Sequence, residues 1–192
     1  THEAGDVEKV AESIAECKRI GITILPPDIN ESFKDFTVIK ATEENKKDSI
    51  RFGLKTIKNF GEGIADSIIA ERKKNGPFKT LADFLSRITD KNLNKKSLES
   101  LIKAGAMDTY GNRHTLLYNL DRLLTFNKEE RAKESAQDSL FSLFSGDTHV
   151  SELHLEQAPN NSNPTDNLLW EKELLGLYIS GHPLDSFKHK LE

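Results

Sequence analysis

The sequence predicts a mainly α-helical protein that also carries a small β-hairpin and a flexible C-terminal linker. Three observations support this fold class. Apolar residues recur at helical spacing in several segments between residues 5 and 176. A glycine-containing break joins two helical runs twice between residues 54 and 124. The stretch 146–167 is polar and includes Asn160-Asn161-Ser162-Asn163-Pro164, a composition typical of a linker.

The first 52 residues predict one helix followed by short extended segments. Residues 5–20 place four apolar side chains on one helical face: Val7, Val10, Ile14 and Cys17. Gly21 is a good terminator for that helix. Residues 22–25 are β-prone and stop at two prolines. Residues 36–40 and 49–52 alternate in hydrophobicity around a polar loop, which predicts a β-hairpin.

The stretch Leu54–Arg72 (LKTIKNFGEGIADSIIAER) predicts two helical limbs joined by a tight turn at residues 59–63. The second limb is amphipathic, because its apolar residues lie at i, i+4 spacing: Ile64, Ala65, Ile68 and Ile69. In the turn, Asn59 and Gly61 are the residues best able to adopt a positive φ.

This turn is a candidate site for the backbone of a nucleic acid. Gly61 and Gly63 carry no Cβ, so N–H groups at the start of the second limb can approach an external surface closely. Unpaired N–H groups at a helix N-terminus favour phosphate, and Lys55 and Lys58 add positive charge. Residues 50–80 carry a net charge of +4 within a chain of net charge −4. The alternative is an ordinary helix-turn-helix corner with solvated lysines.

The same residues resemble the helix-hairpin-helix family. Its hairpin typically reads hydrophobic-Pro-Gly-hydrophobic-Gly, with an alanine four residues later. Here the match is Ile57-Lys58-Asn59-Phe60-Gly61, followed by Ala65. Lys58 replaces the proline, which loosens the turn, and Asn59 replaces the first glycine but tolerates the left-handed conformation. The resemblance implies that this hairpin, Phe60 included, contacts DNA phosphates without reading the bases.

A second and weaker unit follows. Thr80–Asp83 resembles a capping box that opens a helix, with apolar residues Leu81, Phe84, Leu85 and Ile88. Residues 97–104 predict another helix, which a turn at Gly105 connects to a helix starting near Asn112 and carrying Leu116, Leu117, Leu120, Leu123 and Leu124. Because the family often has tandem units, the resemblance implies a tandem helix-hairpin-helix domain with further DNA contacts at Lys103 and Gly105. Gly105 by itself fits a plain helix C-cap.

A compact apolar cluster follows the charged segment 128–136. It reads Gln137-Asp138-Ser139-Leu140-Phe141-Ser142-Leu143-Phe144. One interpretation is a short helix folded onto the core. The other is a linear motif in which Leu140 and Phe141 enter a hydrophobic groove of a partner while Gln137 bonds to its rim. Phe144 fits either an anchor or a core residue. Beyond it, residues 168–183 predict a short helix ended by Gly176.

Five stretches together resemble the family of alpha subunits of bacterial DNA polymerase III, and they occur in the family's order. They are GITILPPDINES (21–32), IRFGLKTIKN (50–59), GPFKTLADF (76–84), LESLIKAGAM (98–107) and ELLGLYISGHPL (173–184). The resemblance implies the end of the fingers region at 1–49, a tandem helix-hairpin-helix domain at 50–127, a clamp-binding motif and linker at 128–167, and a lead-in to an oligonucleotide-binding domain at 168–192.

The same resemblance implies the partners. They are double-stranded DNA, held without sequence preference, the sliding clamp (beta subunit) and other subunits of the polymerase III holoenzyme. Gln137-Asp138-Ser139-Leu140-Phe141 matches the Gln-x-x-Leu-Phe form of the clamp motif, so Gln137, Ser139, Leu140 and Phe141 are the expected clamp-binding residues.

The sequence predicts no catalytic centre. Two-metal phosphoryl transfer needs clustered carboxylates, and no Asp-x-Asp pair or comparable acidic cluster lies on a predicted strand. The six histidines form no ligand set. We therefore expect no catalytic residue, metal site or cofactor in this chain, and a requirement for Mg²⁺ only in the parent polymerase.

The composition predicts a cytoplasmic fragment of a larger protein. The chain begins at Thr1 and shows no signal peptide or long apolar run, so no membrane partner is expected. Its single cysteine, Cys17, excludes an internal disulfide framework and fits a reducing compartment. Two other functions stay open: a DNA-repair enzyme domain with the same hairpins, and a protein–protein adaptor that uses the apolar cluster without DNA.

Overall fold

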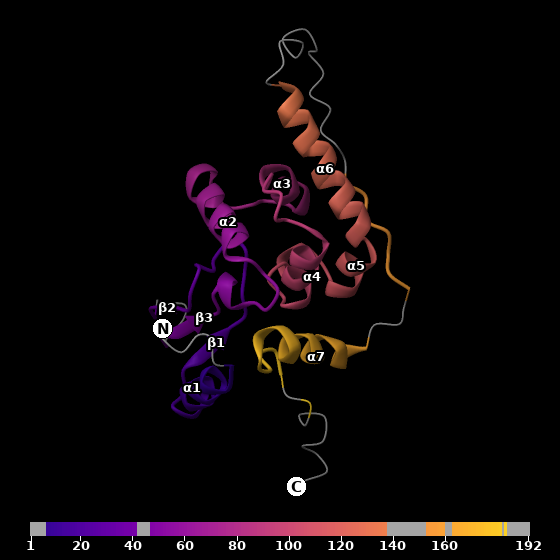
Figure 1. Cartoon of the computed structure of the whole chain (residues 1–192). Coiled ribbons are helices and arrows are strands. Elements are labelled where there is room, and N and C mark those ends of the chain that lie inside the picture. Colours follow the sequence, from indigo (N-terminus) through magenta and orange to yellow (C-terminus); the bar gives the residue numbers. More distant parts are fainter. Residues whose placement is uncertain (1–6, 42–46, 138–152, 160–162, 182, 184–192) are drawn as a thin grey trace.

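The computed structural model describes residues 7–41, 47–137, 153–159, 163–181 and 183 (Figure 1). Its helices are α1 (Val7–Arg19), α2 (Glu62–Asn75), α3 (Leu81–Arg87), α4 (Lys95–Lys103), α5 (Arg113–Tyr118), α6 (Leu120–Gln137) and α7 (Pro164–Leu175). Two short 3₁₀ turns are η1 (Leu54–Thr56) and η2 (Asp108–Tyr110), and the strands are β1 (Thr23–Leu25), β2 (Thr37–Ile39) and β3 (Ser49–Arg51). The prediction of a mainly helical fold is confirmed.

The three strands form one small sheet in the order β1-β3-β2. The antiparallel pairing of β2 with β3 confirms the predicted hairpin, and Val38 lies opposite Ile50. The parallel pairing of β1 with β3 was not predicted; it places Ile24 opposite Ile50. Such a pair joins segments that are distant in the sequence, so no local pattern announces it.

One hydrophobic core runs from α1 to the segment after α7, with buried members that include Ile14, Phe52, Phe84, Leu123 and Leu177. Helix α4 lies at the centre of the helical part and packs against α5, α6 and α7 (Figure 1). Residues 7–49, predicted as a region of their own, join this core. The Arg72 side chain on α2 donates to the Ile29 carbonyl (2.7 Å), and Asn30 exchanges two hydrogen bonds with the backbone of Phe78 (2.8 and 3.0 Å).

The first limb of the predicted hairpin is not an α-helix. Residues Leu54–Thr56 form a single 3₁₀ turn, and Ile57 is extended (φ −70°, ψ 121°). The N–H groups of Leu54 and Lys55 donate to the carbonyls of Phe33 and Lys34, at 2.9 and 3.0 Å. This pairing with a distant segment replaces the contacts that would have continued a helix.

The helix expected from Asn112 onward is two helices, α5 and α6, separated at Asn119. Asn119 is buried, and its side chain bonds both the N–H and the carbonyl of Glu156 (2.9 and 2.8 Å). Helix α6 then continues to Gln137, so residues 128–137 are helical.

The segment 146–167 differs in part from the flexible linker that its composition predicts. Residues 153–159 lie along α6, and Leu153 and Leu155 pack against the core. Residues 164–167 already belong to α7, because Asn163 caps its N-terminus and Pro164 occupies its first turn. Helix α7 ends at Gly176 in the left-handed conformation (φ 80°), as the sequence predicts.

Candidate nucleic-acid interface

The predicted tight turn lies between η1 and α2. Asn59 adopts a left-handed conformation (φ 65°), which confirms the prediction for this residue. The N–H of Phe60 closes the turn on the Ile57 carbonyl (3.1 Å). Gly61 is different: it is extended (φ −72°, ψ 148°) and serves as the N-cap of α2, so the prediction of a positive φ there was wrong.

The N-terminus of α2 presents free donors to solvent. Gly61 has no side chain to cap the helix, and no other capping side chain is present among the described residues. Residues 61–63 are all exposed, so the N–H groups of Glu62 and Gly63 point out of the first turn without a partner within the helix.

Neither glycine is needed for packing inside the protein. A Cβ built on Gly61 meets nothing within 4 Å, and one built on Gly63 makes only an ordinary contact, 3.8 Å from the Asn92 side-chain amide. A glycine in the first turn of a helix costs stability relative to alanine. The space left open here therefore faces outward, toward whatever approaches α2.

Three lysines surround this end of the helix. Lys55 and Lys58, both predicted, are exposed, and Lys34 was missed by the sequence reasoning. Lys34 forms ion pairs with Glu62 and with Asp66 (3.2 Å), while Lys55 lies 3.6 Å from Glu62. The hydrogen bond from Lys34 lowers the pKa of Glu62, so this carboxylate stays charged near neutral pH.

Lys34 reaches α2 because the backbone at residues 34–35 passes directly over Gly53. A Cβ on Gly53 would lie 2.5 Å from the Lys34 carbonyl oxygen and from the Asp35 carbonyl carbon, so only glycine permits this approach. The approach depends on the fold rather than on a local pattern. No signal in the sequence around Lys34 could have identified it.

Phe60 anchors the turn from inside. Its side chain is 5% exposed and belongs to the same core as Ile57 and Ile64. The backbone N–H of Lys58 donates to the Leu174 carbonyl at the end of α7 (2.9 Å), which holds the turn from another side. Phe60 thus offers almost no surface to DNA, although it belongs to the matched hairpin pattern.

The second predicted turn is built as a helix end. Gly105 (φ 84°) follows α4, its N–H donates to the Ile102 carbonyl, and the N–H of Ala106 donates to the Leu101 carbonyl. These two hydrogen bonds form a Schellman motif, a common C-terminal cap of α-helices. Gly105 is buried, and a Cβ there would lie 2.3 Å from the Arg113 side chain. Because Gly105 has no free N–H, we leave it out of the proposed interface.

Lys103, the other residue predicted at this turn, is engaged on the protein surface. Its ammonium lies 2.6 Å from a Glu99 carboxylate oxygen and 5.8 Å from the centre of the Trp170 ring. A DNA contact at Lys103 stays a prediction, and it would require the ion pair with Glu99 to open.

A buried ion pair fixes this second unit against α7. Arg113 lies over Gly105 and donates to Asp108 (2.8 and 2.7 Å), to the Lys103 carbonyl (3.1 Å) and to Glu171 (3.2 Å). Burial opposes the charge of Arg113, but these acidic partners outweigh it and raise the Arg113 pKa. The other oxygen of Glu171 accepts from the N–H groups at positions 179 and 180 (2.9 and 3.0 Å).

The predicted clamp motif begins where α6 ends. Gln137 is the last residue of that helix, whereas Ser139, Leu140, Phe141 and Phe144 lie outside the described residues. The choice between a core segment and a linear motif therefore stays a prediction.

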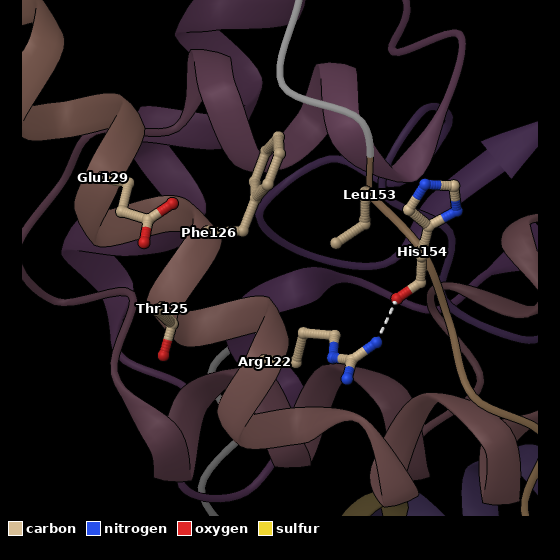
Figure 2. Close-up of a pocket in the computed structure, with 6 residues that line it drawn as sticks. All are labelled: Arg122, Thr125, Phe126, Glu129, Leu153 and His154. Atoms are coloured by element: carbon tan, nitrogen blue, oxygen red, sulfur yellow. Dashed lines mark hydrogen bonds between the residues drawn. The ribbon is translucent and has the colours of Figure 1, made fainter.

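Residues 153–156 lie beside α6. Figure 2 shows the hollow between them, where Leu153 and His154 face Arg122 and Phe126. Arg122 donates to the His154 carbonyl (2.9 Å) and also pairs with Glu156. These contacts hold His154 and Glu156 beside the helix that ends at Gln137.

Neither a metal centre nor a membrane span is found within the part of the chain that the structure describes. In those residues no three His, Cys, Asp or Glu side chains gather in a way that could hold an ion. No described helix combines the length and apolarity needed to cross a bilayer.

Comparison with known proteins relates this geometry to a family. A family model described as "Helix-hairpin-helix motif" matches residues 21–116, which include the first predicted unit and the second as far as Leu116. The chain is 43% identical over 185 residues to DNA polymerase III subunit alpha of Thermus aquaticus, covering 95% of this chain and 14% of that protein.

Two further relatives carry the same name. The Borreliella burgdorferi protein is 40% identical over 194 residues (100% of this chain, 16% of the relative). The Deinococcus radiodurans protein is 42% identical over 186 residues (96% and 13%). The chain thus spans about one seventh of the length of these relatives. It belongs to the helix-hairpin-helix motif family, and nearly all of it is homologous to one region of DNA polymerase III subunit alpha.

Proposed function

We propose that this chain is the part of a replicative DNA polymerase that holds duplex DNA, in the cytoplasm, through contacts to phosphates alone. The observation that carries the proposal is the uncapped, exposed N-terminus of α2, where a Cβ on Gly61 would meet no described atom within 4 Å and one on Gly63 would make only an ordinary contact with Asn92. The family match over residues 21–116 supports it, because it covers this turn.

The arrangement suits sequence-independent binding. Backbone N–H groups and lysine ammonium groups contact phosphate oxygens, which are the same at every base pair. Lys58 has no ion-pair partner among the residues that the structure describes, and Lys34 and Lys55 are held nearby by Glu62. The carboxylate of Glu62 also repels phosphate, so it lowers the affinity of the site for duplex DNA. A low affinity allows the duplex to advance past a polymerase after each added nucleotide.

Titration of a labelled duplex against the 192-residue chain at several salt concentrations tests this proposal. Each lysine that contacts a phosphate contributes about 0.9 to the slope of log K against log salt. Lys55→Ala and Lys58→Ala should each flatten the slope by about that amount. Gly61→Val should weaken binding by blocking close approach, because the Cβ position is open toward the outside. A folded Gly61→Val variant that binds duplex as tightly as the wild type would contradict the proposal.

We further propose that residues 137–141 attach the polymerase to the sliding clamp, with Gln137, Leu140 and Phe141 as the main contacts and Ser139 between them. The support is the sequence match, together with the hydrogen bond from Arg122 to the His154 carbonyl, which places described residues that follow the motif in the sequence beside the helix that precedes it (Figure 2). Each buried apolar anchor contributes about 1.5–3 kcal/mol, so the motif by itself should bind in the micromolar range.

Replacement of Gln137, Leu140 and Phe141 by alanine together tests the clamp contact. We expect loss of clamp binding with an almost unchanged melting temperature. Unfolding of the triple variant would favour the core interpretation, and a folded variant that still binds the clamp would place the contact elsewhere. Phe144→Ala in the same assay decides whether Phe144 is an anchor.

Nucleotidyl transfer belongs, in this proposal, to the parent polymerase with its Mg²⁺ ions and other holoenzyme subunits. The 192-residue chain should show no primer extension with Mg²⁺ and nucleotides. Extension that persists through rigorous purification would refute this assignment.

A DNA-repair domain would share duplex binding but lack clamp binding, and an adaptor without DNA would show no salt-dependent duplex binding.

A further inference from the structure

Asn75 and Gly76 connect the end of α2 to the segment that leads into α3. Asn75 is the last residue of α2 and is exposed, and Gly76 follows it with a positive φ (83°). This is the only place in the sequence where a glycine follows an asparagine. At such a pair, the side-chain carbonyl carbon of the asparagine lies close to a backbone nitrogen that no neighbouring Cβ shields.

The N–H of Gly76 is not engaged by the helix that it follows. After α3 and α4, the corresponding N–H groups of Ile88 and Ala104 donate to carbonyls of the helix (3.0 and 2.9 Å). The Gly76 N–H donates to no acceptor among the residues that the structure describes. A Cβ built on Gly76 meets no described atom within 4 Å, so the space around this residue is open. The Gly76 nitrogen is therefore available for a reaction.

Arg87 on α3 places a positive charge beside this nitrogen. Its guanidinium donates to the Gly76 carbonyl (2.8 Å) and to the Glu71 carboxylate (2.9 Å). It also lies 4.4 Å from the centre of the Phe78 ring, so several contacts fix its position. An amide nitrogen attacks a carbonyl carbon after it has lost its proton, and a nearby cation stabilises that anionic form. Arg87 therefore favours a reaction at Gly76, and its pairing with Glu71 reduces the opposing effect of that carboxylate.

One hydrogen bond restrains the Asn75 side chain. Its amide donates to the Glu71 carboxylate, one turn earlier on α2 (2.7 Å), and this bond is exposed to solvent. The last turn of a helix opens more easily than its interior. Each opening frees the Asn75 side chain to rotate toward the Gly76 nitrogen. The bond to Glu71 thus slows the reaction relative to an unstructured peptide, but it does not prevent the reaction.

We propose that Asn75 is a site of spontaneous deamidation and backbone isomerisation. The deprotonated Gly76 nitrogen attacks the Asn75 side-chain carbonyl carbon, and the side-chain nitrogen takes up a proton and leaves as ammonia, which gives a cyclic succinimide. Water then adds to one of the two succinimide carbonyls, and the bond from that carbonyl carbon to the Gly76 nitrogen breaks. Opening at the side-chain carbonyl gives aspartate, and opening at the main-chain carbonyl gives isoaspartate. Water is the only co-reactant, and nothing is oxidised or reduced.

The product carboxylate is unfavourable in the place where it forms. It lies at the C-terminus of α2, which is the negative end of the helix dipole, and beside Glu71, which loses the donor that Asn75 supplied. Isoaspartate also adds a methylene group to the main chain just before a segment that Asn30 holds by two hydrogen bonds to the backbone of Phe78 (2.8 and 3.0 Å). The reaction therefore loosens the last turn of α2. This inference does not depend on the proposed function.

Incubation of the 192-residue chain at physiological temperature and pH, followed by peptide mapping, tests the site. Mass spectrometry detects the gain in mass when a hydroxyl group replaces the amide nitrogen, and fragmentation distinguishes isoaspartate from aspartate. Asn59 and Asn92 are internal controls, because both are exposed but the N–H of the next residue donates to a backbone carbonyl (3.1 and 3.0 Å). We expect deamidation at Asn75 to be several-fold faster than at either control. Equal or slower deamidation at Asn75 would overturn the proposal.

Two variants of the same position give a second readout. A carboxyl methyltransferase that recognises isoaspartate should label the aged wild-type chain, whereas an aged Asn75→Gln variant should stay almost unlabelled, because glutamine would have to form a larger ring. Equal labelling of the two chains would refute Asn75 as the site. Asn75→Asp, the ordinary hydrolysis product, should melt at a lower temperature than Asn75→Gln. Equal melting temperatures would contradict the loosening of α2.

Discussion

Replacing Gly61 by aspartate should move stability and DNA affinity in opposite directions. Gly61 is the N-cap of α2 in an extended conformation that any residue adopts, and its Cβ position is empty to 4 Å. Aspartate is preferred over glycine at this position by a few tenths of a kcal/mol, and its charge at the helix N-terminus adds about 0.3–1 kcal/mol. Repulsion from the nearby Glu62 offsets part of this gain. We expect the free energy of unfolding to rise by about 0.5 kcal/mol.

The same carboxylate should oppose duplex DNA. It would accept the N–H groups that the proposal assigns to a phosphate, and it would place a negative charge beside that phosphate. Two like charges 4 Å apart repel by about 4 kcal/mol at an effective dielectric constant near 20, and salt reduces this value. We therefore expect at least a tenfold loss of affinity, equal to about 1.4 kcal/mol.

Urea denaturation and fluorescence anisotropy with a labelled duplex measure the two effects on one preparation. Asn163→Asp is a matched control, because Asn163 is the exposed N-cap of α7 and gains the same charge at an equivalent helix position. The control should bind duplex almost as the wild type does. Full affinity in a folded Gly61→Asp variant would refute the placement of a phosphate at α2, and so would an equal loss in the control.

Three other outcomes are expected. Glu62→Gln should remove the ion pairs of Glu62 with Lys34 and Lys55, leave Lys34 paired with Asp66, and raise duplex affinity several-fold with a steeper salt dependence. Because Lys34 lowers the Glu62 pKa, wild-type binding should show no titration of Glu62 near neutral pH, and lower affinity in the variant would contradict its role. Gly105→Ala should destabilise the fold by about 2 kcal/mol in urea denaturation, because its φ is 84° and its Cβ would overlap Arg113; wild-type stability would refute this. Glu171→Ala should destabilise the fold by about 1–3 kcal/mol by the same measurement, since it removes one of the two acidic partners of Arg113 and the acceptor of the N–H groups at positions 179 and 180. Wild-type stability would show that these bonds are dispensable.

Features that depend on neighbouring residues were predicted well from the sequence. Asn59 takes the left-handed conformation, Gly176 ends α7, and the Thr80 hydroxyl accepts from the Asp83 N–H at the start of α3 (3.0 Å). Each outcome follows from the conformational range or hydrogen-bonding reach of one side chain within a few positions. The start of α7 could also have been found, because Asn163-Pro164 followed by Asp166 is a typical helix N-terminus.

Features that depend on distant residues were missed. The first limb of the hairpin is a 3₁₀ turn because Phe33 and Lys34 take its N–H groups, and those residues precede it by about twenty positions. Lys34 reaches α2 where the chain passes closely over Gly53, and Asn92 lies beside Gly63 in a loop that the hydrogen bond between Asp90 and Ser67 joins to α2. A pattern of charge or hydrophobicity describes one segment, whereas a binding surface is assembled from several.

The contacts of Glu171 have a mechanical consequence. This single carboxylate joins three parts of the chain: α5 through Arg113, α7 on which it lies, and the backbone at residues 179 and 180. The direction in which the chain leaves α7 is thereby set by two short backbone bonds to an immobile group, and rotation about Gly176 would break both. A force that rotates the chain at residues 179 and 180 therefore acts on Glu171, on its partner Arg113 and on the turn at Gly105 that Arg113 covers. The chain does not rotate freely about Gly176.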